Sequence, residues 1–142
     1  MAPVDRTKLR SHLDFVRKNL RMLEQLRGEG REAFLGDDKS QAAAARWLQT
    51  AIEAVIDIAN HVIAREGLGV PRAYSETIEI LAREGVLPAD RRETFLAMVR
   101  FRNRVVHLYD EVAPGEVWRI LEDDLGDFDA FIAVIASRYL AN

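Results

Sequence analysis

Apolar residues in the first part of the chain recur at alternating steps of three and four, the spacing that buries one face of a helix. The positions are Leu9, Leu13, Val16, Leu20, Leu23 and Leu26. They predict an amphipathic helix over residues 5–27, and the glycine-containing segment 28–30 is expected to end it. The polar stretch that follows, through Asp38, is expected to form a loop before the next helix begins.

Four later segments show the same periodicity and are also expected to be helices. The second is predicted over residues 39–66, and the third, which is short, between Ser75 and Gly85. The fourth starts at Asp90 with a capping-box-like pattern, and the fifth is predicted over residues 114–139. The sequence contains neither a convincing strand-like alternation nor an internal repeat. We therefore predict an all-α, up-and-down bundle of about five helices.

Length and composition limit the classes of protein that the chain can represent. With 142 residues and an apolar fraction of 49%, residues 1–142 are expected to form a single domain with its own core. The chain has no cysteine, which excludes disulfides and thiolate zinc sites and favours a reducing cytoplasm. Its histidines, His12, His61 and His107, are too widely spaced to indicate a histidine metal site. We expect neither a metal nor another cofactor.

The longest apolar stretch, residues 42–64, contains Arg46, Glu53 and Asp57. Charged side chains at the centre of a bilayer are costly, so this stretch is expected to be a buried helix and not a membrane span. The N-terminal segment lacks the apolar core and the small-residue cleavage site of a secretory signal. Both features favour a cytoplasmic protein that does not partner a membrane.

The formal net charge of -3 excludes a protein that coats nucleic acid through bulk positive charge. Basic residues are nevertheless concentrated in one short segment, at Arg91, Arg92, Arg100, Arg102 and Arg104. This concentration is consistent with two interpretations, a locally positive groove or a set of ordinary solvated helix faces.

The segment from Arg102 to Tyr109, RNRVVHLY, combines an arginine, a histidine and a tyrosine near the end of the fourth predicted helix. A guanidinium can bind a phosphate through two N–H groups, and an imidazole can move a proton near neutral pH. This combination suits chemistry on a phosphodiester. Taken alone, however, His107 is more simply a structural residue that the helix dipole stabilises when protonated.

Helical geometry restricts how these side chains can meet. At about 100° per residue, Asn103 and His107 share one face of the helix, with Arg104 on nearly the same face. Arg102 lies about 140° around the axis from His107. Convergence of Arg102 and His107 therefore requires that the arginine stem bends back or that a second subunit supplies another copy of the motif.

The segment RNRVVHLY fits the R-x4-H-x-Y signature of the HepT-like toxins of the HEPN superfamily. The resemblance extends to residues 51–87, which look like the second and third helices of that family, and to residues 98–112, which look like its fourth. Proteins of this family are helical ribonucleases that pair with a minimal nucleotidyltransferase antitoxin. The resemblance thus covers nearly the whole chain and implies a HEPN-like helical fold.

The resemblance implies a role for each residue of the motif. Arg102 and His107 match the catalytic pair of a metal-independent endoribonuclease, in which His107 moves a proton and Arg102 stabilises charge on the phosphoryl oxygens. Asn103 is expected to orient the phosphate or the imidazole, and Arg104 and Arg100 to hold neighbouring phosphates of the RNA. The family also implies a homodimer that brings two motifs into one cleft.

Two further residues, Tyr109 and Asp57, also have predicted roles. The family's antitoxin transfers AMP to the motif tyrosine, which implies that Tyr109 is modified and that the added negative charge excludes RNA. Asp57 forms a polar patch with Asn60 and His61 on the second predicted helix. Asp57 either pairs with His61 at a spacing of four or reaches across to Arg102 and fixes its direction.

Two alternatives to a ribonuclease stay open. The first is a catalytically inactive HEPN scaffold that binds a partner nucleotidyltransferase and is modified by it. The second is a plain helical dimerisation domain without a ligand. The sequence indicates neither the RNA target nor the number of AMP units added.

Overall fold

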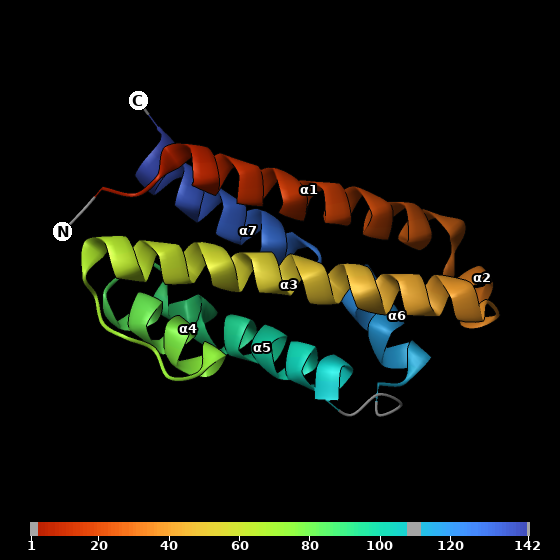
Figure 1. The fold of residues 1–142 in the computed structure, drawn as a ribbon. Coiled ribbons are helices and arrows are strands. Elements are labelled where there is room, and N and C mark those ends of the chain that lie inside the picture. Colours follow the sequence, from red (N-terminus) through yellow and green to blue (C-terminus); the bar gives the residue numbers. More distant parts are fainter. Residues whose placement is uncertain (1–2, 108–111, 142) are drawn as a thin grey trace.

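The computed structural model describes residues 3–107 and 112–141, and the regular structure of these residues is entirely helical (Figure 1). The described α-helices are α1 (Arg6–Glu29), α2 (Arg31–Leu35), α3 (Asp38–Glu66), α4 (Tyr74–Arg83), α5 (Arg92–His107), α6 (Pro114–Asp123) and α7 (Gly126–Ile135). A 3-10 turn, Ala89–Arg91, precedes α5, and a π-helical turn, Ala136–Leu140, follows α7. The predicted all-α class is confirmed, whereas seven described α-helices exceed the predicted number of about five.

The long helices run alternately up and down, and α3 lies at the centre of the bundle (Figure 1). It contacts α1, α2, α4, α5 and α6, while α1 and α5 flank it on opposite sides. The two ends of the described chain lie at the same end of the bundle. This arrangement presents the last turns of α5 beside the middle of α3.

Two predicted boundaries are wrong. The segment predicted as a loop before residue 39 contains α2, whose Phe34 is buried against Trp118 of α6 with ring centroids 5.6 Å apart. The predicted fifth helix is divided into α6 and α7 at Asp124 and Leu125. The apolar spacing continues through this break because Leu125 is itself buried, so the pattern alone does not reveal it.

Local signals explain where α3 begins and ends. The Asp37 carboxylate accepts hydrogen bonds from the Lys39 backbone N–H at 3.1 Å and from the Ser40 hydroxyl at 2.8 Å. The hydrogen bond from Ser40 contributes most to lowering the pKa of Asp37, and the bond from Lys39 adds to it. Gly67 ends the helix in a left-handed conformation with φ 67°, and Leu68 donates its backbone N–H to the Ile63 carbonyl.

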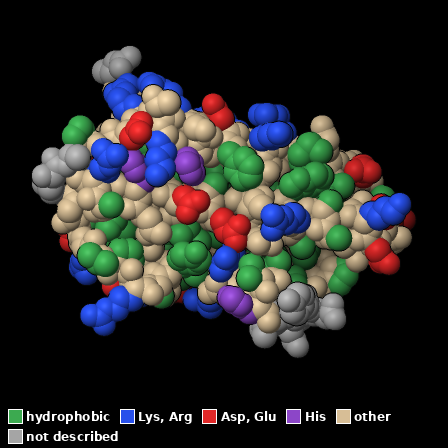
Figure 2. Space-filling model, viewed as in Figure 1, with side chains coloured by type: hydrophobic (Ala, Val, Ile, Leu, Met, Phe, Trp, Pro, Cys, Tyr) green, Lys and Arg blue, Asp and Glu red, His purple; other side chains and the backbone are tan. Residues whose placement is uncertain are grey.

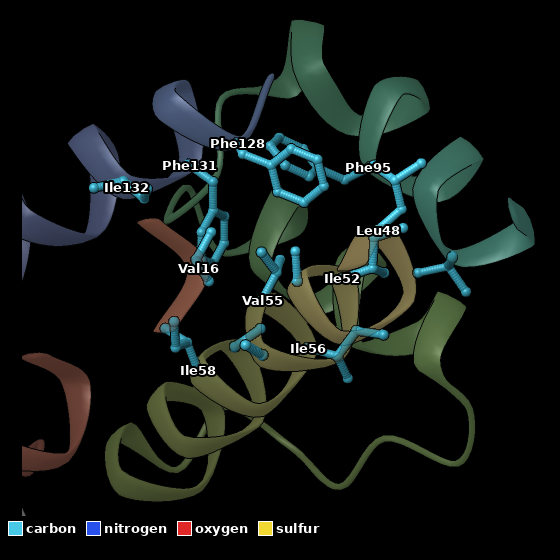
Figure 3. Packing of buried hydrophobic residues seen from close by; sticks show 14 of the residues in the cluster. Val16, Leu48, Ile52, Val55, Ile56, Ile58, Phe95, Phe128, Phe131 and Ile132 are labelled. Carbon is cyan, nitrogen blue, oxygen red and sulfur yellow. The ribbon is translucent and has the colours of Figure 1, made fainter. Parts of the chain in front are cut away.

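The core lies between α3 and the helices that surround it (Figure 3). Val16 of α1 and Ile52 of α3 point toward the side of the core where Phe131 of α7 and Phe95 of α5 meet. The ring centroids of Phe95 and Phe131 are 5.7 Å apart. Phe95 and Phe131 are each 1% exposed. Burial of these rings fixes α5 against α7 and so positions the polar residues that follow on α5. Within residues 3–107 and 112–141, no helix has the length and hydrophobicity needed to cross a bilayer.

Candidate active site on α5

Helix α5 is anchored by a buried apolar stripe and leaves its last turns available for polar chemistry. Phe95, Leu96, Val99 and Phe101 are buried. The helix contacts α3 and α4 along this stripe. The stripe does not continue beyond Phe101, since residues 102–106 are half-buried and His107 is exposed. The sequence therefore places the motif where the helix leaves the core.

Arg102 turns back toward α3 and is held there by Glu53. Its Nε and Nη2 atoms donate to Glu53 Oε2 at 2.9 and 2.8 Å, and its Nη1 donates to Asn103 Oδ1 at 3.2 Å. The Tyr74 ring, at the start of α4, lies against the guanidinium with 5.0 Å between Cζ and the ring centroid. The Arg102 side chain is only 15% exposed. Three elements of the bundle therefore fix this one cation.

The other arginines of the basic segment point elsewhere and have acidic partners of their own. Arg104 lies toward α6, where its Nη1 is 2.8 Å from Glu116 Oε1. Arg100 is exposed, with its nearest carboxylate at 3.8 Å. Figure 2 shows basic side chains separated by acidic and hydrophobic ones over α1, α3 and α5. On the face seen there, one chain does not present a continuous positive groove, so the interpretation as separate helix faces describes it better.

His107 is the final residue of α5 and is exposed. Among the described residues, no hydrogen bond joins it to Arg102, whose contacts are with Glu53, Asn103 and Tyr74. The predicted modification site, Tyr109, lies outside the described residues. One chain thus provides an anchored cation and an accessible imidazole that lie near each other in sequence and, among the described residues, are not hydrogen-bonded to each other.

Among the described residues, no hydrogen bond or ion pair joins Asp57 to Arg102 or to His61. The carboxylate that fixes Arg102 is Glu53, one helical turn before Asp57, and Asp57 itself is exposed. His61 is 8% exposed, and its Nε2 accepts the Asp5 backbone N–H at 2.9 Å. Burial is the main cause that lowers the pKa of His61, and Lys8 and Arg65 add to it. His61 therefore ties α3 to the start of α1 and is structural.

Glu53 and Tyr74 are not predicted from the sequence as parts of the site. In the sequence, Glu53 is a charge that interrupts an apolar stretch, although it shares a helix face with Asp57, four residues later. The contact between Arg102 and Tyr74 depends on how α4 packs against α5, which no local pattern reports. Within residues 3–107 and 112–141, no group of three or more His, Asp or Glu side chains is arranged to hold a metal ion.

One hollow borders the motif helix, and a second borders Glu53, the partner of Arg102. A cavity of about 600 Å³ between α3, α5, α6 and α7 is lined by apolar side chains such as Met98 and Phe101, with Arg104 and Glu116 among its polar residues. A shallower groove between α1 and α3 reaches Glu53 and is bordered by Phe15. Arg104 thus lines the first hollow, whereas the partner of Arg102 lines the second.

Comparison with known proteins gives this geometry a context. The family model HepT-like, described as ribonuclease HepT-like, matches residues 16–135. The chain belongs to the HepT-like family. An mRNA nuclease HepT from Shewanella oneidensis is 31% identical over 123 residues, which cover 87% of this chain and 92% of that relative. A tRNA nuclease HepT from Aphanizomenon flos-aquae is 22% identical over 137 residues, which cover 96% of this chain and 93% of that protein.

The solved structures agree with this family. A tri-AMPylated Shewanella oneidensis HEPN toxin, solved in complex with its MNT antitoxin, superposes with a TM-score of 0.86 at 28% identity. The match covers 92% of this chain and 98% of that toxin. The resemblance to HepT-like proteins that the motif suggested is therefore confirmed, and the HepT-like fold extends over α1 to α7.

Proposed function

We propose that this HepT-like protein is a toxin that cleaves RNA without a metal ion, with Arg102 and His107 as its catalytic residues. The observation that carries the proposal is an anchored guanidinium and an exposed imidazole on the last turns of α5. The 31% identity to a protein named mRNA nuclease HepT supports it. A tRNA nuclease is a further relative, so the class of RNA is decided by experiment.

The reaction that these groups suit is attack by a ribose 2'-hydroxyl on the adjacent phosphorus. The 2'-oxygen forms a bond to phosphorus and loses its proton to a base, while the bond to the 5'-oxygen breaks and that oxygen gains a proton. His107 transfers a proton in this step, and Arg102 stabilises the charge on the phosphoryl oxygens. Asn103, Arg104 and Arg100 contribute to phosphate binding. DNA is not cut because it lacks the hydroxyl.

The active form is proposed to be a homodimer. In one chain, Arg102 and His107 lie about 140° apart around α5, and no hydrogen bond joins them among the described residues. A second copy places another Arg102 and another His107 in the same cleft. That arrangement allows one histidine to accept the 2'-proton while the other donates to the leaving oxygen. It also brings the arginines of two motifs to one phosphate, each arginine still paired with a carboxylate of its own chain.

The proposed partner is a minimal nucleotidyltransferase antitoxin that attaches AMP to Tyr109. Support comes from the similar toxin that was solved AMPylated and bound to an MNT antitoxin. A nucleotide on Tyr109 places negative charge two residues from His107, where it repels the RNA backbone. Co-expression with a neighbouring nucleotidyltransferase gene should increase the intact mass of this chain by one or more AMP units, and Tyr109→Phe should abolish the increase. An unchanged mass after co-expression would leave this form of neutralisation without support.

The nuclease proposal is tested with purified protein in the presence of EDTA. The protein should cut a single-stranded RNA and leave the DNA of the same sequence intact, and its expression alone should arrest growth. The expected products end in a 2',3'-cyclic phosphate on one side and a 5'-hydroxyl on the other. Loss of cutting on addition of EDTA would contradict the metal-independent mechanism, and an intact RNA under all conditions would favour the inactive scaffold.

A further inference from the structure

We infer that Glu53 is a positioning residue for RNA cleavage, because it holds Arg102 in the orientation that presents the arginine's remaining N–H groups to a phosphate. This inference rests on the proposed nuclease function and adds to it a residue on another helix. Glu53 lies 49 positions before Arg102, in the middle of α3. The pair therefore couples the central helix of the bundle to the motif.

The hydrogen bonds of Arg102 leave a defined part of the guanidinium for a substrate. A guanidinium has five N–H groups in a planar fork. Glu53 Oε2 accepts from Nε and Nη2, and Asn103 Oδ1 accepts from Nη1. Among the described residues, these bonds leave one N–H on Nη1 and one on Nη2. A pair of this kind binds two oxygens of one phosphate.

The surroundings of the pair fix the plane and the rotation of the fork. The Tyr74 ring covers the guanidinium at 5.0 Å and limits tilting, while Gln49 Nε2 donates to the same Glu53 Oε2 at 3.3 Å and so restrains the carboxylate. The Arg102 side chain is 15% exposed, against 38% for Arg104 and 63% for Arg100. The Arg102 side chain is thus less exposed than those of Arg100 and Arg104, and its fixed orientation is the kind of preorganisation that catalysis uses.

The negative charge of Glu53 makes it possible to distinguish a positioning role from simple attraction of RNA. The carboxylate of Glu53 partly neutralises the positive charge of Arg102, so Glu53 weakens the binding of a polyanion in the ground state. If Glu53 serves orientation, its replacement by the neutral isostere glutamine should lower kcat without raising KM for RNA. A purely structural defect would instead reduce the amount of folded enzyme, and an autoinhibitory contact would make the variant faster.

The test compares Glu53→Gln with Glu79→Gln. Glu79 is a matched control because its carboxylate also forms an interhelical ion pair, at 2.6 Å from Arg92 across α4 and α5, away from the motif. In Glu53→Gln, kcat should fall about 10- to 100-fold while KM stays constant or decreases. Both parameters should stay within about twofold of the parent in Glu79→Gln. A Glu53→Gln enzyme with parental or higher kcat would overturn the inference.

A second measurement does not depend on activity. The nuclear magnetic resonance signal of the Arg102 Nε–H, assigned by its absence from Arg102→Lys, should be protected from exchange in the parent and in Glu79→Gln, and lost in Glu53→Ala, which removes the acceptor. An unchanged signal in Glu53→Ala would show that Glu53 does not hold Arg102 and would refute the inference. If the parent cuts no RNA at all, the proposed function fails, and this signal still decides whether Glu53 fixes Arg102.

Discussion

The contact between Phe131 and Phe95 predicts a large loss of stability when the ring of Phe131 is removed. Phe131 is 1% exposed and packs on Phe95 with 5.7 Å between ring centroids, so Phe131→Ala leaves a cavity between α7 and the helix that carries the motif. Such a truncation costs about 3–5 kcal/mol. The total free energy of unfolding of a domain of this size is roughly 5–15 kcal/mol, so Phe131→Ala should remove a large part of that stability.

Urea unfolding followed by circular dichroism measures the loss. The free energy of unfolding should fall by about 3–5 kcal/mol, and the Tm by roughly 6–20 °C. Phe15→Ala is the matched control, because Phe15 is 45% exposed on α1 and the same truncation there should cost at most about 0.5 kcal/mol. If the two variants lose equal stability, or if Phe131→Ala loses less than about 1 kcal/mol, the described packing of α7 against α5 is incorrect.

The remaining predictions concern His61 and two glycines. The pKa of His61 is lowered from 6.5 by burial, so the unfolded state binds more protons below that value, and stability should fall with decreasing pH more in the parent than in His61→Gln. Equal slopes of unfolding free energy between pH 7.5 and 5 would contradict this role. Gly85 has φ 75° and open space at its Cβ position, so Gly85→Ala should cost about 1 kcal/mol of backbone strain. Gly28→Ala, within α1, should instead stabilise the protein by about 0.5 kcal/mol, because alanine has the higher helix propensity. If thermal unfolding shows that both substitutions raise the Tm, or that both lower it, the assignment of these two backbone conformations is incorrect.

The limits of prediction for the fold have physical causes. The periodicity that predicted helices over residues 5–27 and 39–66 is confirmed by α1 and α3, because a long buried stripe leaves a strong signal. Helix α2 has a single buried side chain, Phe34, and one apolar position cannot show a helical periodicity. The break between α6 and α7 is hidden because Leu125 is buried at the junction and preserves the spacing.

For the candidate site, local sequence indicates which residues can take part in the reaction, but not which other residues fix their orientation. The spacing of Arg102 and His107 could be read directly from the motif. Glu53 and Tyr74 come from α3 and the start of α4, and their contacts with Arg102 arise only when three helices pack together. The polar patch around Asp57 directs attention to that residue, whereas Glu53 lies one turn earlier on the same helix face, and sequence does not fix the height at which α5 crosses α3.

The measurement that tests the account most directly is the single-turnover rate at which His107→Ala cuts a defined RNA in EDTA. His107 is exposed, so its truncation should leave the fold and the Tm unchanged. We predict that the rate falls by about 10²- to 10⁴-fold relative to the parent, as expected for loss of the group that transfers the proton. A folded His107→Ala protein that cuts RNA as fast as the parent would contradict it.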